Sequence, residues 1–345
     1  MVLLHAVPPV SPAIALAQAA AALGPLETAE DIIAAVGRLA SEGVLSLPLP
    51  GAGDTAERFR ALGELGAVDL ALTRLAEGHT DALAILAEAG LSPRLGIYGV
   101  WAADATDAKV VAAPTTTGWV LRGRKRYASG ARGLDRALVT AHTDDGVRLF
   151  DIDVHAPGVR PMPETWQAVG MAATDSLDVV FDDAALAVVA VVGGPGFYLE
   201  RPGFWYGAVG VAACWYGGAL GAYRLLRGRF RRTAPDDHQA AHLGAIAAAC
   251  MTMERGLELA ARDIDSHPQG RGRGRTLWIR HVVEQGCQEV LTRAGRAGGT
   301  SPLAFDRTHA RRAADLVTYL RQHHAERDLA ALGQLVLEDD PWTGR

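Results

Sequence analysis

The sequence predicts an α+β protein in which a helical segment, a β segment and a second helical segment follow one another. Apolar residues recur at helical spacing before residue 95 and again after residue 196, whereas short runs rich in valine, threonine and aromatic residues lie between. With 345 residues, 49% of them hydrophobic, the chain can form two or three domains with a substantial core. We expect a helical N-terminal domain at 1–95, a central β domain at 96–196 and a C-terminal helical bundle at 197–345.

The first helical segment runs from Ser11 to about Gly90. Apolar residues that would share a buried helix face are Ile32, Ile33, Val36 and Leu39, and again Leu62, Leu65, Leu72 and Leu75. The residues before it are apolar, but they lack the basic start of a secretion signal and are interrupted by three prolines, Pro8, Pro9 and Pro12. We therefore expect a cytoplasmic protein.

The β segment lies between Gly96 and Val192. Runs such as Trp119–Leu121 and Val147–Ile152 have the composition of strands and are separated by turns. Asp145 and Gly146 stand between two such runs, and both residue types tolerate the positive φ of a type I′ turn. The sequence therefore predicts a tight hairpin with these two residues at its turn.

The last helical segment follows a glycine-rich loop and continues to about Leu337. Pro202 suits its first turn, where the missing N–H would have no partner in any case. Gly203–Tyr223 has no charged residue and is long enough to cross a bilayer, but its many glycines favour a helix buried inside a soluble bundle. Gly270–Arg275 alternates glycine with arginine and is expected to link two helices.

Charge and cysteine content exclude several classes of function. The net charge of −5 gives no field that would gather nucleic acid or anionic lipid, so neither nucleic acid nor a membrane is expected as a partner. The cysteines, at positions 214, 250 and 287, lie far apart without CxxC spacing, which argues against a zinc ribbon and against an extracellular disulfide framework. No metal site is expected.

Several motifs, in their order along the chain, resemble those of the acyl-CoA dehydrogenase superfamily. In the β segment they are Gly123–Gly130, Trp166–Met171 and Asp175–Asp183; after it they are Glu200–Pro202, Gly207–Gly210, Arg227–Phe230 and His238–Ala240. The resemblance covers nearly the whole chain. It implies a helical N-terminal domain, a small β domain and a C-terminal four-helix bundle, with a flavin between the β domain and the bundle.

The resemblance further implies FAD as cofactor and names residues for it. Tyr127 and Ser129 match the aromatic residue and the hydroxyl beside the isoalloxazine ring. The other positions that match flavin-binding positions are Trp101, Ala102 and Thr106 in an earlier loop, Arg227 and Phe230, which would reach the flavin of a neighbouring subunit, and Gly298 and Gly299. A homodimer or homotetramer follows from that shared contact. Two departures, Arg231 for a glycine and Gly295 for a glutamine, put FAD affinity in question.

An acyl thioester dehydrogenase needs a carboxylate that removes the α-proton of its substrate. Most members of the superfamily place it late in the bundle, where this chain has Tyr319–His324 without any acidic residue. Others place it at the start of the first bundle helix, where Glu200 stands. Glu200 is therefore the candidate base, because burial against substrate would raise its pKa towards the working range. Its neighbour Arg201 is expected to bind substrate, carried by coenzyme A or by a carrier protein.

Two alternatives stay open at this point. Reduced-flavin monooxygenases share the fold that the resemblance implies. In such an enzyme, His323 or His324 would serve as a proton donor to an oxygenated flavin. A member of the fold that has lost its flavin could instead be a binding protein. Adjacent histidines on a helix point in different directions, so His323 and His324 are poor joint metal ligands. The sequence identifies neither the substrate nor the electron acceptor.

Overall fold

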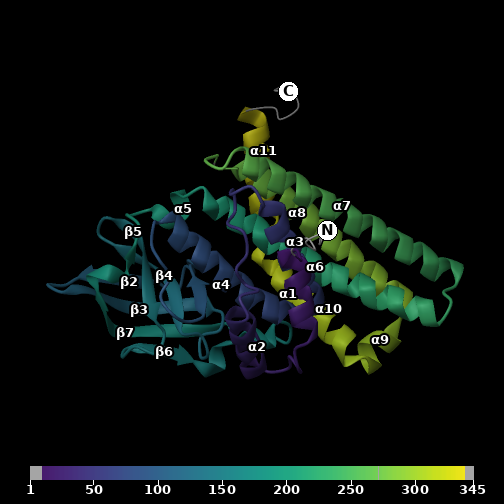
Figure 1. Ribbon diagram of the computed structural model, residues 1–345, viewed down its shortest axis with the longest axis horizontal. Coiled ribbons are helices and arrows are strands. Elements are labelled where there is room, and N and C mark those ends of the chain that lie inside the picture. Colours follow the sequence, from purple (N-terminus) through teal and green to yellow (C-terminus); the bar gives the residue numbers. More distant parts are fainter. Residues whose placement is uncertain (1–9, 271, 339–345) are drawn as a thin grey trace, which may run out of the picture.

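A computed structural model describes residues 10–270 and 272–338 (Figure 1). A twisted sheet occupies one end of the molecule, and long helices occupy the other. Helices come first and last along the chain and the strands lie between them, so the predicted α+β fold is confirmed.

In the part of the chain that the structure describes, the helices before the sheet are α1 (Pro12–Ala21), α2 (Ala29–Ser41), α3 (Thr55–Val68) and α4 (Leu70–Glu88). Each of α1, α2 and α4 begins at a side chain that accepts a backbone N–H, and α2 has a full capping box between Thr28 and Asp31. The apolar residues expected on the buried faces are buried in the core, apart from Ile33, which is half-buried.

The sheet has eight strands: β1 (Tyr98–Trp101), β2 (Val110–Pro114), β3 (Gly118–Ala128), β4 (Arg136–Thr143), β5 (Gly146–Asp153), β6 (Val159–Met162), β7 (Leu177–Ala187) and β8 (Val191–Val192). Their order is β6-β7-β3-β2-β4-β5-β8, and β1 pairs with β4 in parallel. Short 3₁₀ turns lie at η1 (Pro163–Thr165), η2 (Ala172–Thr174) and η3 (Val188–Ala190).

The predicted hairpin is present, but its turn lies one residue earlier than expected. Thr143 pairs with Gly146, so the turn consists of Asp144 and Asp145. Gly146 has a φ of 129°, whereas Asp145 is not among the described residues with positive φ. The Thr143 hydroxyl donates to Asp145 at 2.6 Å, and Arg148 also binds that carboxylate. These side-chain contacts hold Asp145 inside the turn.

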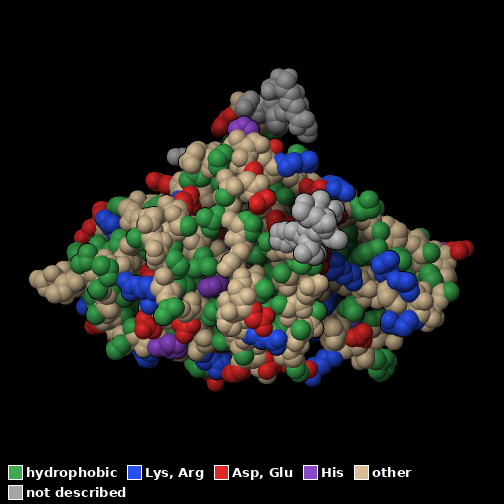
Figure 2. All heavy atoms as spheres, viewed as in Figure 1, with side chains coloured by type: hydrophobic (Ala, Val, Ile, Leu, Met, Phe, Trp, Pro, Cys, Tyr) green, Lys and Arg blue, Asp and Glu red, His purple; other side chains and the backbone are tan. Residues whose placement is uncertain are grey.

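Among the described residues up to position 338, the helices after the sheet are α5 (Phe197–Glu200), α6 (Gly203–Arg232), α7 (Asp237–Ser266), α8 (Arg273–Gly298), α9 (Thr300–Phe305), α10 (Arg307–Tyr319) and α11 (Glu326–Glu338), with the 3₁₀ turn η4 (Leu320–Gln322) after α10. The long helices α6, α7 and α8 pack side by side, and α10 packs against α6. The last turn of α6 carries three arginines, which suit the negative end of a helix dipole, and basic side chains gather at this end of the molecule in Figure 2.

The expected link between α7 and α8 is shorter than Gly270–Arg275, because α8 already begins at Arg273. Arg275 donates to Asp263 near the end of α7 at 3.0 Å, and this contact holds the arginine in the first turn of α8. Gly272, with a φ of 57°, makes the change of direction. Position 271 lies outside the described residues.

The uncharged stretch Gly203–Tyr223 belongs to α6 and is largely buried, as the sequence predicts. None of the helices in the described ranges combines the length and apolar character that crossing a bilayer requires. Glycines on both helices let α6 approach α3 closely. A Cβ on Gly66 of α3 would lie 2.7 Å from the carbonyl oxygen of Cys214 and 3.0 Å from the Cα of Gly217, both in α6. The two helices therefore meet backbone to backbone.

Helix α7 begins with a capping box, in which Asp236 accepts the N–H of Gln239 at 2.8 Å and Gln239 accepts that of Asp236 at 3.1 Å. Asp236→Ala is expected to lower the free energy of unfolding by about 1 kcal/mol, measured by urea denaturation. Thr252→Ala on the exposed face of α7 is the control and should change it by less than ~0.5 kcal/mol. Equal effects of the two changes would contradict the role of the cap.

Helix α4 lies between the sheet and the bundle, because it packs against both β1 and α6 (Figure 1). As many as 14 of its 19 residues are buried, far more than one face of a surface helix provides. Charged residues of α4 therefore point into the protein interior.

Candidate active site

Three hydroxyl side chains meet where the end of β3 approaches the start of β7. The Oγ of Ser129 lies 2.8 Å from the Oγ of Ser176, which lies 2.8 Å from the Oγ1 of Thr174. All three residues are buried. Hydroxyl groups both donate and accept, so this chain of hydroxyls can hold or pass a proton.

The backbone around this hydroxyl chain is strained. Tyr127, Met171 and Asp175 have φ values of 57°, 59° and 47°, in the left-handed region that residues with a side chain rarely adopt. Hydrogen bonds hold the strained segments together: Gly130 donates to the carbonyl of Thr174 at 2.8 Å, and the Nε and Nη2 of Arg132 each donate to Asp175 at 2.8 Å. Strain of this kind is concentrated at functional sites.

An ion pair of α4 reaches the hydroxyl chain. The Nη1 of Arg74 lies 2.6 Å from the Oε2 of Glu77, and the Nε of Arg74 lies 3.4 Å from the Oγ of Ser129. Because the guanidinium group is small and planar, the carboxylate of Glu77 and the hydroxyl of Ser129 lie within about 8 Å of each other. Burial raises the pKa of Glu77 to about 7, even though the charge of Arg74 acts in the opposite direction.

A second buried arginine lies beside this pair. Arg58 of α3 is 4% exposed, and its guanidinium donates to the carbonyl of Pro48 and to the Oγ1 of Thr80, each at 3.2 Å. Burial lowers its pKa, while the negative charges of Asp81 and Glu77 oppose that shift. Arg58, Arg74 and Glu77 are called the charged cluster below.

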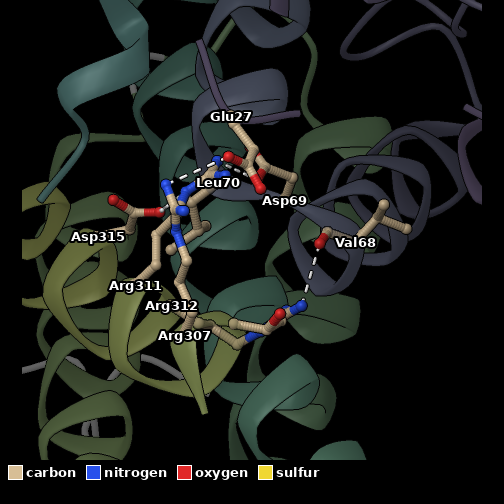
Figure 3. Close-up of a pocket in the computed structure, with 9 residues that line it drawn as sticks. Glu27, Val68, Asp69, Leu70, Arg307, Arg311, Arg312 and Asp315 are labelled. Carbon is tan, nitrogen blue, oxygen red and sulfur yellow. Dashed lines mark hydrogen bonds and ion pairs between the residues drawn. The ribbon is translucent and has the colours of Figure 1, made fainter. Parts of the chain in front are cut away.

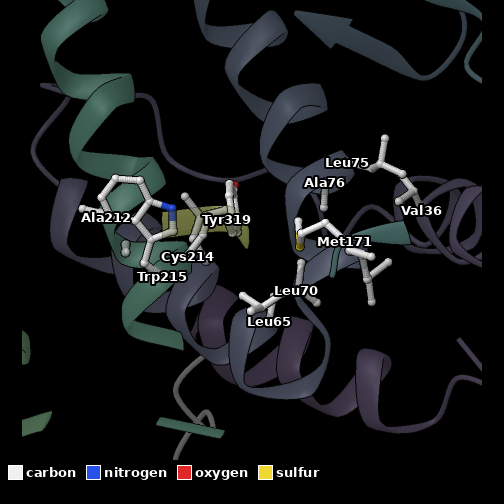
Figure 4. Packing of buried hydrophobic residues seen from close by; sticks show 14 of the residues in the cluster. Val36, Leu65, Leu70, Leu75, Ala76, Met171, Ala212, Cys214, Trp215 and Tyr319 are labelled. Carbon is white, nitrogen blue, oxygen red and sulfur yellow. The ribbon is translucent and has the colours of Figure 1, made fainter. Parts of the chain in front are cut away.

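Next to the charged cluster, three buried polar atoms have no hydrogen-bond partner among the described residues: the Nε1 of Trp215, the hydroxyl of Tyr319 and the Nε2 of His323. The ring of Trp215 lies 6.3 Å from that of Tyr319 and 6.3 Å from that of His323. Figure 4 shows Tyr319 between Trp215 and Cys214 of α6 and Ala76 of α4. Buried polar atoms are nearly always paired, so a polar ligand or water that reached these three atoms would be favoured. The Nε2 of His323 also lies 4.0 Å from the carboxylate of Asp328.

The protonation of these groups is set by burial. Burial raises the pKa of Tyr319 well above that of a free tyrosine, so its hydroxyl keeps its proton and can donate. Burial and the nearby charge of Arg280 lower the pKa of His323, so its imidazole is neutral near neutral pH. The guanidinium of Arg280 lies 4.6 Å from the ring centre of Trp215.

The structure brings together two of the residues predicted to contact a flavin. The Nε1 of Trp101 donates to the backbone carbonyl of Ser129 at 3.1 Å. Tyr127 lies two residues before Ser129 in the chain and is 54% exposed. Ala102 and Thr106 lie in the loop after β1, where Ala102 is half-buried and Thr106 is exposed.

The other predicted flavin positions lie along α6 and at the end of α8. Arg227 is exposed, whereas Phe230 is buried in the core of its own chain. Gly298 is the last residue of α8, and Gly299, with a φ of 63°, ends that helix. Helix termination therefore explains Gly299, and a role of these four residues in binding a cofactor stays a prediction.

Glu200 is placed differently from the expectation. It is exposed, and it ends the four-residue helix α5 rather than standing on the first bundle helix, which begins at Gly203. Its neighbour Arg201 is buried and binds Glu88, the last residue of α4, at 2.9 Å. Ser129 instead contacts Arg74, which lies about 21 Å from Glu88 along the axis of α4. Glu200 and Ser129 thus adjoin opposite ends of α4.

A small surface pocket of about 90 Å³ lies between the start of α4 and α10 (Figure 3). It is far smaller than a typical ligand pocket of roughly 300–1,000 Å³. Its charges bind each other: Arg311 lies 2.5 Å from Asp69, and Arg307 lies 3.2 Å from Glu27. Asp315 at its edge accepts the backbone N–H of Met171 at 2.5 Å. We interpret the ion pairs and the hydrogen bond around this pocket as the contacts that fix α10, and with it Tyr319, against α4.

The charged cluster and the unpaired groups at Trp215 and Tyr319 could not be predicted from the sequence. Arg74 and Glu77 have the spacing of an ordinary ion pair on a helix surface, and nothing in the sequence distinguishes Tyr319 from a residue of the helix core. The sequence of α4 does contain a signal of burial, because its apolar residues occur on all sides of the helix. In 10–270 and 272–338, no group of three or more His, Cys, Asp or Glu side chains is placed to hold a metal ion.

Comparison with known proteins gives matches in structure only. Neither a family model nor a curated protein sequence matches the chain. Among solved structures, dibenzothiophene monooxygenase TdsC from Paenibacillus sp. A11-2 with bound FMN has 19% identity and a TM-score of 0.79, covering 95% of this chain and 96% of its own.

Two further structures are similarly close. Methanesulfinate monooxygenase MsuC from Pseudomonas fluorescens has 17% identity and a TM-score of 0.79, covering 95% of this chain and 97% of its own. KijD3 in complex with FMN and a dTDP-linked amino sugar has 17% identity and a TM-score of 0.78, covering 96% of this chain and 95% of its own. At these identities the similarity establishes the fold.

Proposed function

Because the chain has the acyl-CoA dehydrogenase-like fold, we propose that it is a flavin-dependent oxidoreductase. The observation that carries the proposal is the strained segment at Tyr127 and Ser129. There a half-exposed tyrosine, a buried hydroxyl and the buried Trp101 lie at the end of β3, where Arg74 of α4 reaches Ser129.

The residues present suit a flavin at this segment. The exposed ring of Tyr127 can stack on a planar ring system, and the hydroxyl of Ser129 can donate to one of its nitrogen or oxygen atoms. The guanidinium of Arg74 behind Ser129 would attract negative charge on such a ring. A flavin bound there supplies a two-electron acceptor, and the chain supplies position, charge and proton transfer.

We further propose that the cofactor is FAD, as the resemblance implies. The protein would be a homodimer or homotetramer in which the subunits share the site through Arg227 and Phe230. FMN is the competing cofactor, because TdsC and KijD3 bind FMN. The sequence departures at Arg231 and Gly295 put FAD affinity in question.

The proposed reaction is α,β-dehydrogenation of an acyl thioester, carried by coenzyme A or by a carrier protein, and it requires a carboxylate base. The chain offers two candidates. Glu200 follows from the sequence, and Arg201 beside it is the proposed substrate-binding residue, although its Nη1 already binds Glu88. Glu77 is a buried carboxylate that Arg74 links to Ser129.

A reduced-flavin monooxygenase is the second candidate function. The observation that favours it is His323, a neutral buried imidazole whose Nε2 has no hydrogen-bond partner among the described residues. His324 is exposed and is the weaker of the two histidines for this role. TdsC and MsuC are monooxygenases with the same fold.

The proposal is tested by titrating the flavin-free protein with FAD and with FMN, following flavin absorbance and fluorescence. We expect one of them to bind, and Tyr127→Ala to weaken that binding about tenfold, because a stacking contact contributes about 1.4 kcal/mol. Phe305→Ala, which removes an aromatic ring that is 88% exposed elsewhere, is the matched control. Binding of neither flavin would contradict the proposal and favour a binding protein.

The bound flavin then separates the two reactions. Under anaerobic conditions a panel of acyl-CoAs should bleach the flavin of a dehydrogenase, and Glu200→Gln shows whether that residue is needed. A flavin that no acyl-CoA bleaches, but that consumes oxygen when reduced in the presence of a substrate, would favour the monooxygenase.

A further inference from the structure

We infer that Glu77 is the residue that takes the α-proton from the substrate, with the hydroxyl of Tyr319 donating to the substrate's carbonyl oxygen. This inference rests on the proposed acyl thioester dehydrogenation and assigns its base within the interior rather than at Glu200. It is carried by the position of Glu77 in α4, by its link to Ser129 through Arg74, and by the unpaired hydroxyl that faces it.

The position of Glu77 meets the geometric demands on a base. A base that acts together with a flavin must lie within one small molecule's width of the ring, and Glu77 lies within about 8 Å of Ser129 through the contacts of Arg74. It is 4% exposed, so bulk water does not compete for the proton. Glu200 is exposed and adjoins the far end of α4.

Tyr319 supplies the second half of the site. Its hydroxyl is buried beside the thiol of Cys214, which donates to the carbonyl of Gly210, and no hydrogen bond among the described residues satisfies the hydroxyl geometrically. It lies close enough to Glu77 and Arg74 for their charges to act on it. A donor without a partner is costly to bury, and a carbonyl oxygen of a bound substrate would satisfy it. A hydrogen bond to a thioester carbonyl also acidifies the neighbouring C–H bond, which is the bond that the base must break.

The ion pair of Arg74 explains how a buried site can carry out this step. The Cα–H bond would break, its proton going to an oxygen of Glu77 and its electron pair forming the α,β double bond, and a bound flavin would supply the acceptor for the β-hydrogen as hydride. Glu77 would thereby lose its negative charge as the acceptor gained one. Arg74, which contacts both Glu77 and Ser129, can exchange one anionic partner for the other, so the total charge of the buried site does not change.

The pH dependence follows from the groups that surround Glu77. Burial raises its pKa to about 7, so the basic form is present above neutral pH and is lost below it. The charged and titratable groups that face it are Arg74 and Asp81 on α4, Arg58 on α3, Tyr198 on α5, Cys214 on α6, Arg280 on α8 and Tyr319 on α10. The rate of proton removal should therefore rise with pH through an apparent pKa near 7.

The experiment measures solvent deuterium entering the α-carbon of an acyl-CoA, by NMR, with enzyme whose flavin has been reduced beforehand. Exchange then reports proton removal without hydride transfer. We expect Glu77→Gln to slow exchange at least 100-fold, the usual contribution of a general base. Tyr319→Phe should slow it about tenfold, and Glu258→Gln on the surface of α7 should leave it unchanged.

Three controls make the result decisive. Flavin binding and circular dichroism show whether Glu77→Gln is folded; if it is not, Glu77→Asp, which keeps the charge, should fold and exchange more slowly than the unchanged protein. Infrared spectra of the flavin-free protein should show a carboxyl band that titrates near neutral pH and is absent in Glu77→Gln.

Exchange that survives in Glu77→Gln, or that is unchanged in Glu77→Asp when Glu77→Gln does not fold, overturns the assignment. Loss of exchange in Glu200→Gln alone would return the role to Glu200. A protein that binds flavin but exchanges no acyl-CoA overturns this assignment together with the proposed acyl chemistry, whereas the first two outcomes leave that chemistry intact.

Discussion

Gly66→Ala is expected to lower the free energy of unfolding by roughly 2 kcal/mol. The new Cβ would lie 2.7 Å from the carbonyl oxygen of Cys214 and 3.0 Å from the Cα of Gly217, and both atoms belong to the backbone of α6. Neither can rotate away, so α3 and α6 must separate. Overpacking of this kind costs about 1–3 kcal/mol, and the better helix propensity of alanine offsets up to about 1 kcal/mol.

Urea denaturation of Gly66→Ala and of a matched glycine variant measures this effect. Gly244 lies on the exposed side of α7, and a Cβ there would meet no atom of the described residues within 4 Å. Gly244→Ala should therefore raise the free energy of unfolding by about 0.5–1 kcal/mol. If both changes stabilise the protein, α3 and α6 do not meet backbone to backbone.

The second large effect is expected at the ion pair between Glu88, at the end of α4, and Arg201, which precedes α6. The Nη1 of Arg201 lies 2.9 Å from the Oε2 of Glu88, and the other oxygen of Glu88 accepts the N–H of Gly203 at 3.1 Å. Only 3% of the Arg201 side chain is exposed. Glu88→Gln leaves a buried guanidinium without its counter-charge, which should cost about 3 kcal/mol of unfolding free energy.

The matched change is Glu258→Gln, which removes the acid of an exposed pair. Arg255 and Glu258 lie 2.7 Å apart, but 71% of the arginine side chain is exposed. Water solvates both charges there, so thermal and urea denaturation should show a loss of less than ~0.5 kcal/mol. A similar small loss in Glu88→Gln would mean that water reaches Arg201.

The fold could be predicted from the sequence because its main signals are local. Leu62 and Leu65 are spaced for one helix face whatever lies against them, and both are buried. The motifs that resemble the acyl-CoA dehydrogenase superfamily predicted the right fold, which the structural matches confirm. The turn at Asp145 was misplaced by one residue because side-chain contacts of Thr143 and Arg148, rather than residue type alone, determine it.

Half of the candidate site could not be read from the sequence, because burial depends on distant segments. Arg74 and Glu77 become a buried pair only when α6 and α10 cover α4. His323 and His324 are adjacent and chemically identical, yet one is buried beside Trp215 and the other is exposed. Ser129, in contrast, lies in a motif with a recognisable order, and the structure gives it a contact with Trp101.

The burial of α4 on both sides has a consequence for how this protein can diverge. A helix at a protein surface has positions where substitutions accumulate freely, but most positions of α4 touch either the sheet or the bundle. His79, which follows Glu77 by two residues on this helix, is also buried and accepts the backbone N–H of Tyr98 in β1. New substrate preferences that reshape the surroundings of Glu77 would therefore have to arise from α3, α5, α6, α8 and α10, while α4 itself changes slowly.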